Sequence, residues 1–562
     1  METHTRHLLV AGTHSRLNGA AKLTERLTGL PGRFALPATL AGLSLLVALI
    51  GMYWDIGAHI DDGRDASVLA APHIPIIVGL HGLVLAGVLN GLLPGPRTRG
   101  ERSLAGGRLS VAPGAIQAIV CGSVAILAFP LDLAWHALFG EDVTLWGPTH
   151  LFMIGGGTLG LVGVWMLFRN GLALGSPTRL VRSSQFALAG GLVLGASSFG
   201  AEFDFGVPQF QLLYQPLLIA FTAGLAFVCA RCVLGPFGAL KALAFYLLMR
   251  ATMAVFVGPV LGFTTPDLAL YVAEALVVEA AALRSPRSPL RLALWSGAGI
   301  GTIGLATEWG WTHLTMAHPW TASMLPEALV LAIAAGTGGA LLGARMAQAL
   351  VEPDEPRAAL PPIPTRAVAV AAVAVLTALA VPLPRTGGDG TVATVVPTAA
   401  GEGRVSLTVQ LEPPAAAARS EWFEVISWQG RAPRRLTALE EVAPGRFQTA
   451  EPVPAAGPDW KTLVRLGKGS HLMAVPVYLP PSPLSARPGV PVASRSEPME
   501  SDTFQLQREA TGGPRWLTTL AYALLLAMAA GWLWVTGWAL HAGEVRARKP
   551  KWVGPGEGLA TA

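Results

Sequence analysis

Long apolar runs separated by short charged segments dominate residues 37–350 of the chain. Each run has about 20 residues, which is enough for an α-helix to cross a hydrocarbon core of about 30 Å. We therefore predict an all-α polytopic membrane protein with about 12 transmembrane helices arranged as repeated hairpins. The predicted spans are 37–54, 73–95, 113–135, 148–168, 184–203, 211–234, 238–262, 267–283, 290–311, 322–349, 364–383 and 515–541.

The segment between the last two spans has a different pattern. Within residues 403–480, short runs such as VSLTVQL, WFEVISW and MAVPVYL alternate apolar and polar positions and are separated by Pro and Gly. This pattern is typical of a small antiparallel β-sandwich. The flanking stretches 385–400 and 481–514 are rich in Pro, Gly and Ser, and we interpret them as tethers.

Positive charge gathers in alternate loops and orients the predicted helices. These loop residues include Arg97, Arg102, Arg169, Arg179, Arg182, Arg231, Lys241, Arg284, Arg287, Arg345 and Arg357. The positive-inside rule then places the N-terminal segment 1–36 and the tail 542–562 in the cytoplasm, and the β-sandwich outside. The expected location is the cell membrane, with the lipid bilayer as the first partner. The sequence leaves open whether the chain also associates with itself or with other membrane subunits.

Composition excludes several other classes of protein. Of all residues, 52% are hydrophobic and 13% are charged, whereas soluble domains carry about 25% charged residues. The net charge of +5 lies mostly in short loops, without basic stretches interleaved with aromatics, so nucleic-acid binding is not expected. The three cysteines lie in apolar runs and form no disulfide framework, and the first 36 residues lack the apolar core of a cleaved signal peptide.

A repeated set of ionisable residues is the most informative feature. Asp55, His59 and His73 are spaced by 4 and then 14 positions, and Asp132, His136 and His150 repeat both spacings. Residues four apart share one face of a helix, and a hairpin returns the second histidine to that face. Each copy thus offers two imidazoles and one carboxylate, a set that suits copper, iron or zinc. The alternative is that these pairs only cap helices or belong to a proton path.

A third hairpin carries a degenerate version of the same set. His313 and Glu327 again differ by 14, and Glu308 lies five positions before His313. Trp309 stands where the complete copies have Asp. We predict that this third set binds metal poorly or not at all. No catalytic residue and no site for an organic cofactor can be named from the sequence.

The second copy, DLAWHALFGEDVTLWGPTHLFMIGG, resembles the C subunit of particulate methane and ammonia monooxygenases. The matched residues are Asp132, Trp135, His136, Asp142, Pro148 and His150. In that family the Asp and the two His bind copper, so the resemblance implies a copper site here. The first copy is similar to the family's neighbouring constellation, except that Asp55 stands where the family has Asn.

Other features depart from that family. The family enzymes use three different subunits, whereas this chain is longer than the C subunit and is fused to its β-sandwich. The family's outer domains are cupredoxin-like, but this one has His471 and Met473 and no cysteine. It looks more like β-sandwich modules of the FixH and YtkA type. We therefore keep two hypotheses: a copper-dependent membrane monooxygenase, and a protein that acquires, stores or delivers copper without catalysis.

The predicted orientation can be checked by labelling. Cysteines placed at Ser420 and Ser176 are expected to react with an impermeant thiol reagent from opposite sides of the membrane, because an odd number of spans separates them. Labelling of both positions from the same side would contradict the predicted orientation.

Overall fold

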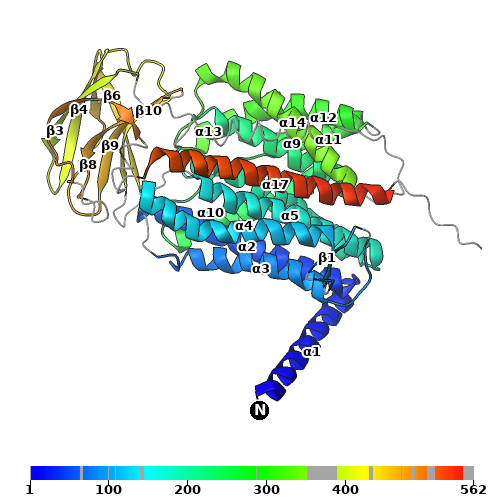
Figure 1. The fold of residues 1–562 in the computed structure, drawn as a ribbon. Coiled ribbons are helices and arrows are strands. Elements are labelled where there is room, and N and C mark those ends of the chain that lie inside the picture. Colours follow the sequence, from blue (N-terminus) through cyan, green and yellow to red (C-terminus); the bar gives the residue numbers. More distant parts are fainter. Residues whose placement is uncertain are drawn as a thin grey trace, which may run out of the picture.

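A computed structural model shows a bundle of membrane-type helices with a β domain packed at one end (Figure 1). The structure describes residues 2–547 except 64–66, 99, 105, 108, 140–144, 209–210, 286–287, 351–388, 429–433, 470, 482–487, 503–504 and 506–512. Helix α1 (Glu2–Thr28) projects from the end of the bundle opposite the β domain.

The bundle consists of helices that follow one another in short hairpins. They are α2 (Gly32–Asp61), α3 (His73–Leu92), α4 (Pro113–Phe139), α5 (Pro148–Leu174), α6 (Arg179–Ser183), α7 (Gln185–Ser197), η1 (Ser198–Gly200), α8 (Ala201–Asp204), α9 (Tyr214–Leu234), α10 (Gly238–Val255), η2 (Phe256–Val260), α11 (Val272–Arg284), α12 (Pro289–Gly299), η3 (Ile300–Gly304), α13 (Leu305–Thr315), η4 (Ala322–Met324), α14 (Leu325–Leu350) and α17 (Arg515–Ala547). The small hairpin β1 (Arg102–Leu104) and β2 (Leu109–Val111) lies between α3 and α4.

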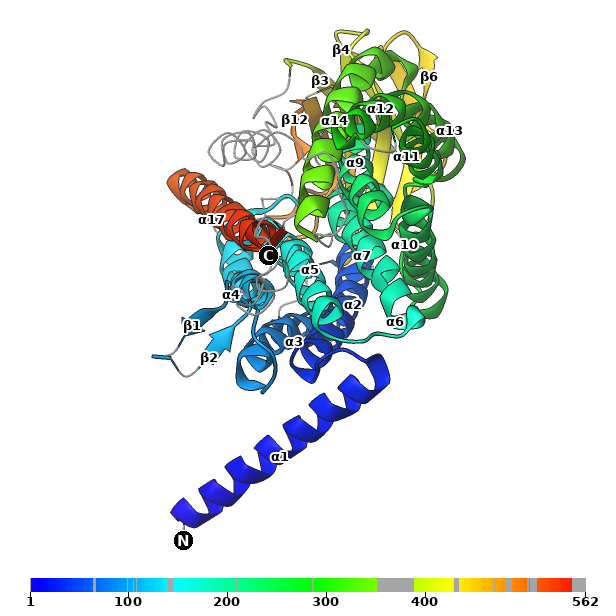
Figure 2. The same ribbon diagram turned by 90° about the vertical axis from the view of Figure 1, so that its right-hand side faces the viewer.

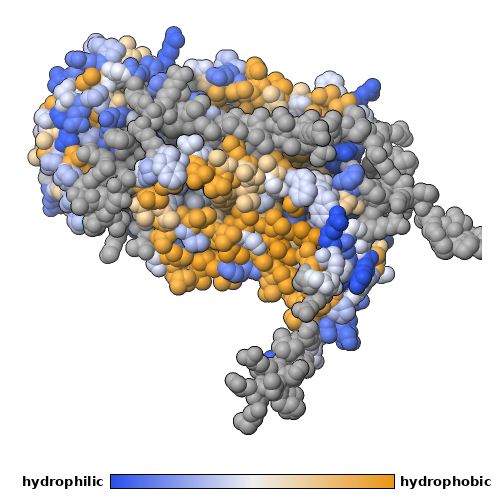
Figure 3. Space-filling model, viewed as in Figure 1, coloured by the Kyte–Doolittle hydropathy of each residue, from blue (hydrophilic) through white to orange (hydrophobic). Residues whose placement is uncertain are grey.

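Nine helical segments of the described chain are long and apolar enough to cross a membrane. They match nine of the predicted spans, and apolar side chains cover much of the described surface of the bundle on the face that Figure 3 shows. The predicted span 364–383 lies outside the described residues. The other two predicted spans form shorter helices. Within 267–283, α11 begins only at Val272, and within 290–311 the π-helix η3 separates α12 from α13.

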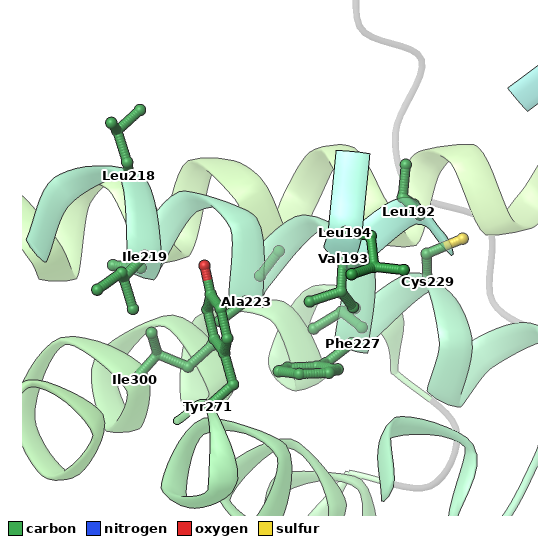
Figure 4. Packing of buried hydrophobic residues seen from close by; sticks show 14 of the residues in the cluster. Leu192, Val193, Leu194, Leu218, Ile219, Ala223, Phe227, Cys229, Tyr271 and Ile300 are labelled. Atoms are coloured by element: carbon green, nitrogen blue, oxygen red, sulfur yellow. The ribbon is translucent and has the colours of Figure 1, made fainter. Parts of the chain in front are cut away.

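Small residues let the helices approach each other closely. Between α9 and α14, a Cβ added to Gly224 would lie 2.3 Å from the carbonyl oxygen of Gly336, and one added to Gly343 would lie 2.2 Å from that of Leu225. Such contacts are the usual means of packing helices in a bilayer, where lipid competes with every apolar side chain. Larger side chains of α7 and α9 fill the same part of the bundle, where the ring of Phe227 lies 5.9 Å from that of Tyr271 (Figure 4).

Viewed along the bundle, α2 to α5 form one group and α9 to α14 another, with α17 beside α4 and α5 (Figure 2). Helix α7 contacts both α5 and the second group through α9 and α10. Both complete Asp/His sets belong to the first group.

The β domain is a single barrel-like sheet. Its strands are β3 (Val392–Ala399), β4 (Arg404–Glu412), β5 (Trp422–Trp428), β6 (Arg435–Ala443), β7 (Arg446–Thr449), β8 (Val453–Pro454), β9 (Lys461–Lys468), β10 (His471–Tyr478), β11 (Arg495–Pro498) and β12 (Glu500–Ser501). They hydrogen-bond in the order β11-β3-β4-β7-β6-β5-β9-β10-β12, and β8 pairs with β4. Inward residues such as Val409, Val464 and Val475 form its apolar core.

The sheet extends beyond the predicted range 403–480 at both ends. Strand β3 lies in the stretch interpreted as the first tether, and β11 and β12 lie in the second. Strand β3 pairs along its whole length with β4, from Val392–Glu412 to Ala399–Val405. Its alternation is weak in the sequence because β3 is flanked by Gly and carries an internal Pro397.

Buried polar contacts fix the β domain to the helices. Glu424 of β5 lies 3.0 Å from the Nε2 of His318, whose ring also lies 4.7 Å from that of Trp422. Asp61, at the end of α2, accepts hydrogen bonds from the backbone N–H of Thr264 and from that of Arg434. The two parts therefore form one structural unit.

The pair of His318 and Glu424 makes this docking sensitive to acid. Burial alone would raise the pKa of Glu424, but His318, Arg465 and Arg434 outweigh that effect and hold the pKa below its usual value. A lowered folded-state pKa gives stability that is present above the unfolded pKa of about 4.3 and is lost as the pH falls through the folded value.

We expect Glu424→Gln to weaken the docking of the β domain by about 1–3 kcal/mol at neutral pH, because His318 loses its charged partner. The measurement is resistance to proteolysis at pH 7 and in acid. The variant should also lose less stability than the wild type when the pH is lowered. Glu440→Gln, on the exposed part of β6, is the matched control. Equal acid sensitivity of wild type and Glu424→Gln would contradict this assignment.

Candidate metal centre

Each complete Asp/His set lies where two helices of one hairpin meet at the end of the bundle that carries the β domain. Asp55 and His59 occupy the last two turns of α2, and His73 is the first residue of α3. Asp132 and His136 lie near the end of α4, and His150 lies in the first turn of α5, which begins at Pro148. The proline before or at each second helix favours a helix start there.

The structure brings each predicted set together. In both sets, one ligand atom from each of the three residues lies within 4.8 Å of the other two, so either set could hold a metal ion. We call Asp55, His59 and His73 the first triad, and Asp132, His136 and His150 the second triad.

In the first triad, Asp55 is the shared partner of both imidazoles. Its Oδ1 lies 3.1 Å from the Nε2 of His73 and 3.8 Å from the Nε2 of His59. The two rings are 6.0 Å apart and nearly perpendicular. All three residues are half-buried, with the side chain of Asp55 18% exposed.

The orientation of His73 fits a metal ligand. Its Nδ1 lies 3.1 Å from the carbonyl oxygen of Val68, which can only accept a hydrogen bond, so Nδ1 carries a proton. In the neutral imidazole the Nε2 lone pair then points at the Oδ1 of Asp55, a buried atom for which the described part of the chain provides no hydrogen-bond donor. Two acceptors facing each other require a positive charge between them, supplied by a metal ion or by a second proton on the ring.

In the second triad, Asp132 again lies between two histidines. Its Oδ2 is 3.3 Å from the Nε2 of His136, and its Oδ1 is 3.5 Å from the Nε2 of His150. Thr149 donates a hydrogen bond of 2.6 Å to the same Oδ1 and orients the carboxylate. Hydrogen bonds of this kind hold metal-ligating carboxylates in place. The second triad is less accessible than the first, since His136 is buried.

The third predicted set is not brought together in this way. Among the described residues, only the two triads place three ligand atoms within 4.8 Å of each other. His313 is exposed and its Nδ1 contacts the carbonyl oxygen of Trp309, while Glu308 is buried and accepts hydrogen bonds from the backbone of residues 270 and 271. Glu327 lies in the first turn of α14.

Three further ionisable residues of the two hairpins are His81, Asp61 and Asp142. His81 is exposed on α3, with its Nδ1 2.8 Å from the carbonyl oxygen of Ile77. Asp61, the last residue of α2, is buried and contacts Thr264 and Arg434. Asp142 lies outside the described residues.

Both triads line the same cavity, which has a volume of about 670 Å³. The cavity runs between α2, α5 and α7 from the triads to Ala38 and Phe168 at the far end of the bundle. Apart from the triads, its walls are mostly Leu, Ile, Met, Gly and Phe side chains. It also reaches Leu43, which is 59% exposed on the outer surface of α2.

The β domain forms part of the same cavity wall. Ile426, Trp428, Arg434, Leu463 and Arg465 line it beside the triads. Burial lowers the pKa of Arg434 to about 10, so this guanidinium keeps its charge at neutral pH. These residues could not be found from the sequence, because nothing in the β-strand pattern shows which strands face the helices.

Glu202 is a further buried acid in the cavity wall. Its carboxylate accepts a hydrogen bond from the backbone N–H of Leu145, in the connection that leads to the second triad. Its signal in the sequence is weak: Glu202 and Asp204 form an acidic pair, but no histidine follows either residue at the spacings of the triads.

Comparison of the chain with protein-family models, with curated proteins and with solved structures found no match. The assignment of the site therefore rests on the geometry of the triads and their cavity.

We expect the wild-type protein to bind two metal ions per chain, one for each triad. His136→Ala should bind one fewer, because one carboxylate and one imidazole make a weak site, while the first triad stays intact. Metal content after loading and desalting, measured by mass spectrometry, checks this. His81→Ala is the control, since it removes an exposed imidazole outside both triads. If His81→Ala lost as much metal as His136→Ala, the assignment of the site would be contradicted.

Proposed function

We propose that this chain is a copper-dependent membrane oxidoreductase that oxidises a small apolar substrate with O2. The observation that carries the proposal is that two triads with metal-binding geometry line a single, mostly apolar cavity. Pockets that combine apolar walls with a few convergent polar groups are typical of ligand sites.

Copper is favoured by the donor set and by the sequence resemblance. Imidazole suits copper, iron and zinc alike, and a set of two imidazoles and one carboxylate leaves coordination positions open. The resemblance of the second triad to the copper site of particulate monooxygenases selects copper among them. The chemistry that bound copper supplies is one-electron redox change and activation of O2.

The residues of the chain would supply orientation and exclusion of water. Thr149 fixes Asp132, and the carbonyl oxygen of Val68 fixes the tautomer of His73. The β domain covers the triad end with Trp428 and Leu463. Insertion of one oxygen atom of O2 requires two electrons and two protons from an external donor, and the other oxygen leaves as water.

The proposed setting is the cell membrane, with both termini in the cytoplasm and the β domain outside. The support is the distribution of positive residues, which lie in the loops at the end of the bundle far from the triads, such as Arg97, Arg179 and Arg284. In this orientation both triads lie near the outer boundary of the bilayer.

The test is O2 consumption by the purified, copper-loaded protein in lipid nanodiscs with a quinol as reductant. We expect consumption that depends on copper and that falls at least about tenfold in His136→Ala, because loss of a ligand weakens the centre. His81→Ala should behave like the wild type. Stoichiometric copper binding without any O2 consumption would overturn the proposal in favour of copper acquisition, storage or delivery.

A further inference from the structure

A second group of buried ionisable residues lies away from the cavity, between α10, α11 and α13. Asp204, Glu274 and Glu308 are 7%, 1% and 0% exposed, and the guanidinium of Arg250, 1% exposed, is buried with them. Arg250 forms an ion pair of 2.8 Å with Asp204 and donates to the backbone oxygen of Asp267. Among the described residues, no cation forms an ion pair with Glu274 or Glu308.

Glu308 is held as an acceptor. Its two carboxylate oxygens accept hydrogen bonds from the backbone N–H groups of Leu270 and Tyr271, at 3.1 and 2.5 Å. These N–H groups are free because residues 261–271 are not helical and Tyr271 has a φ of 56° just before α11. Two donors on two oxygens stabilise the ionised form of Glu308.

Glu274 has the opposite surroundings. Its Oε2 is buried and has no hydrogen-bond partner among the described residues. Its Oε1 rests against Gly304, the last residue of η3 and the N-cap of α13, where an added Cβ would lie 2.7 Å away. Gly304 and Glu308 are four residues apart and share one face of the helix, so the carboxyl of Glu274 faces the side of α13 that carries Glu308.

The other groups around this pair do not supply a positive charge. Tyr246 donates its hydroxyl to the carbonyl oxygen of Ala269, and its ring packs 5.2 Å from that of Tyr271. The ring of Tyr271 lies among apolar side chains that include Ile219, Ala223 and Ile300 (Figure 4). Among the described residues, the other charged groups nearby are Asp204, Asp267 and two arginines. Arg250 is already paired with Asp204, and Arg434 lies beside Asp267 and donates to the backbone oxygen of Gly206.

Two ionised carboxylates cannot stay side by side in a low-dielectric interior without a cation. Neighbouring acids resolve this conflict by sharing a proton, as paired catalytic carboxylates do. We propose that Glu274 and Glu308 form a buried proton-binding site, in which Glu274 carries the exchangeable proton and Glu308 carries the charge. This site is independent of the triads, since neither residue lines their cavity.

The position of the pair suits a proton that is taken up and released. Glu274 lies in the first turn of a helix that starts within the bundle after a non-helical segment. Membrane proteins place ion-binding and proton-binding acids at such interruptions, where irregular backbone is sheltered by neighbouring helices.

The test is infrared spectroscopy of the intact protein in lipid. We expect a carbonyl stretching band of a protonated carboxylic acid that shifts in D2O and that is lost in Glu274→Gln. Glu279→Gln is the matched control: Glu279 lies on the same helix but forms an ion pair of 2.9 Å with Arg231, so this change should leave the band intact. Identical acid bands in wild type and Glu274→Gln would overturn the proposal.

Stability separates the roles of the two acids. Glu274→Gln should keep the melting temperature close to that of the wild type, because an amide resembles a protonated carboxyl. Glu308→Gln should lower it, because the amide NH2 would face the backbone N–H groups of residues 270 and 271. An equal decrease in melting temperature in both variants would show that Glu274 is ionised and would overturn the proton assignment. The same conclusion would follow if Na⁺ raised the melting temperature of the wild type but not that of Glu274→Gln.

Discussion

Every ionised group that the described chain buries among its helices needs an opposite charge or hydrogen-bond donors close by, and the arrangement of the bundle follows from that constraint. An isolated ion loses several kcal/mol when it leaves water, even after the surroundings relax. Arg250 meets Asp204, and Asp132 meets two imidazoles and a hydroxyl. These contacts join α4 to α5 and α10 to the segment after α7. The polar contacts thus select which helices become neighbours, while glycines and other small residues set how closely they pack.

The spacing of the triads could be predicted from the sequence because it depends only on local geometry. A separation of four residues defines a shared helix face, and a turn of a dozen residues returns the chain to the same height in a hairpin. The degenerate copy shows where this reasoning ends. The carboxylate of Glu308 accepts hydrogen bonds from the backbone N–H groups of residues 270 and 271. These N–H groups are available because the chain of the neighbouring hairpin is not helical there. No spacing within residues 305–327 contains this information.

The limits of the β domain were harder to predict for a related reason. Strand β3 carries few large apolar residues and is recognisable only through its pairing with β4. Arg434 and Arg465 look like ordinary strand and loop cations in the sequence, yet both lie against the helices, with Arg465 2% exposed. Contacts between parts that are hundreds of residues apart depend on how the two surfaces meet, and periodicity does not describe that.

Leu43 both lines the cavity and is 59% exposed on the outer surface of α2, and this has a consequence for how the protein would meet its ligand. The β domain covers the triad end, so a molecule that passes Leu43 arrives from the hydrocarbon phase and not from water. Its effective concentration is then set by its partition coefficient between membrane and buffer. An apparent affinity expressed per volume of solution would change with the amount of lipid in the sample, whereas one expressed as a mole fraction in the bilayer would stay constant.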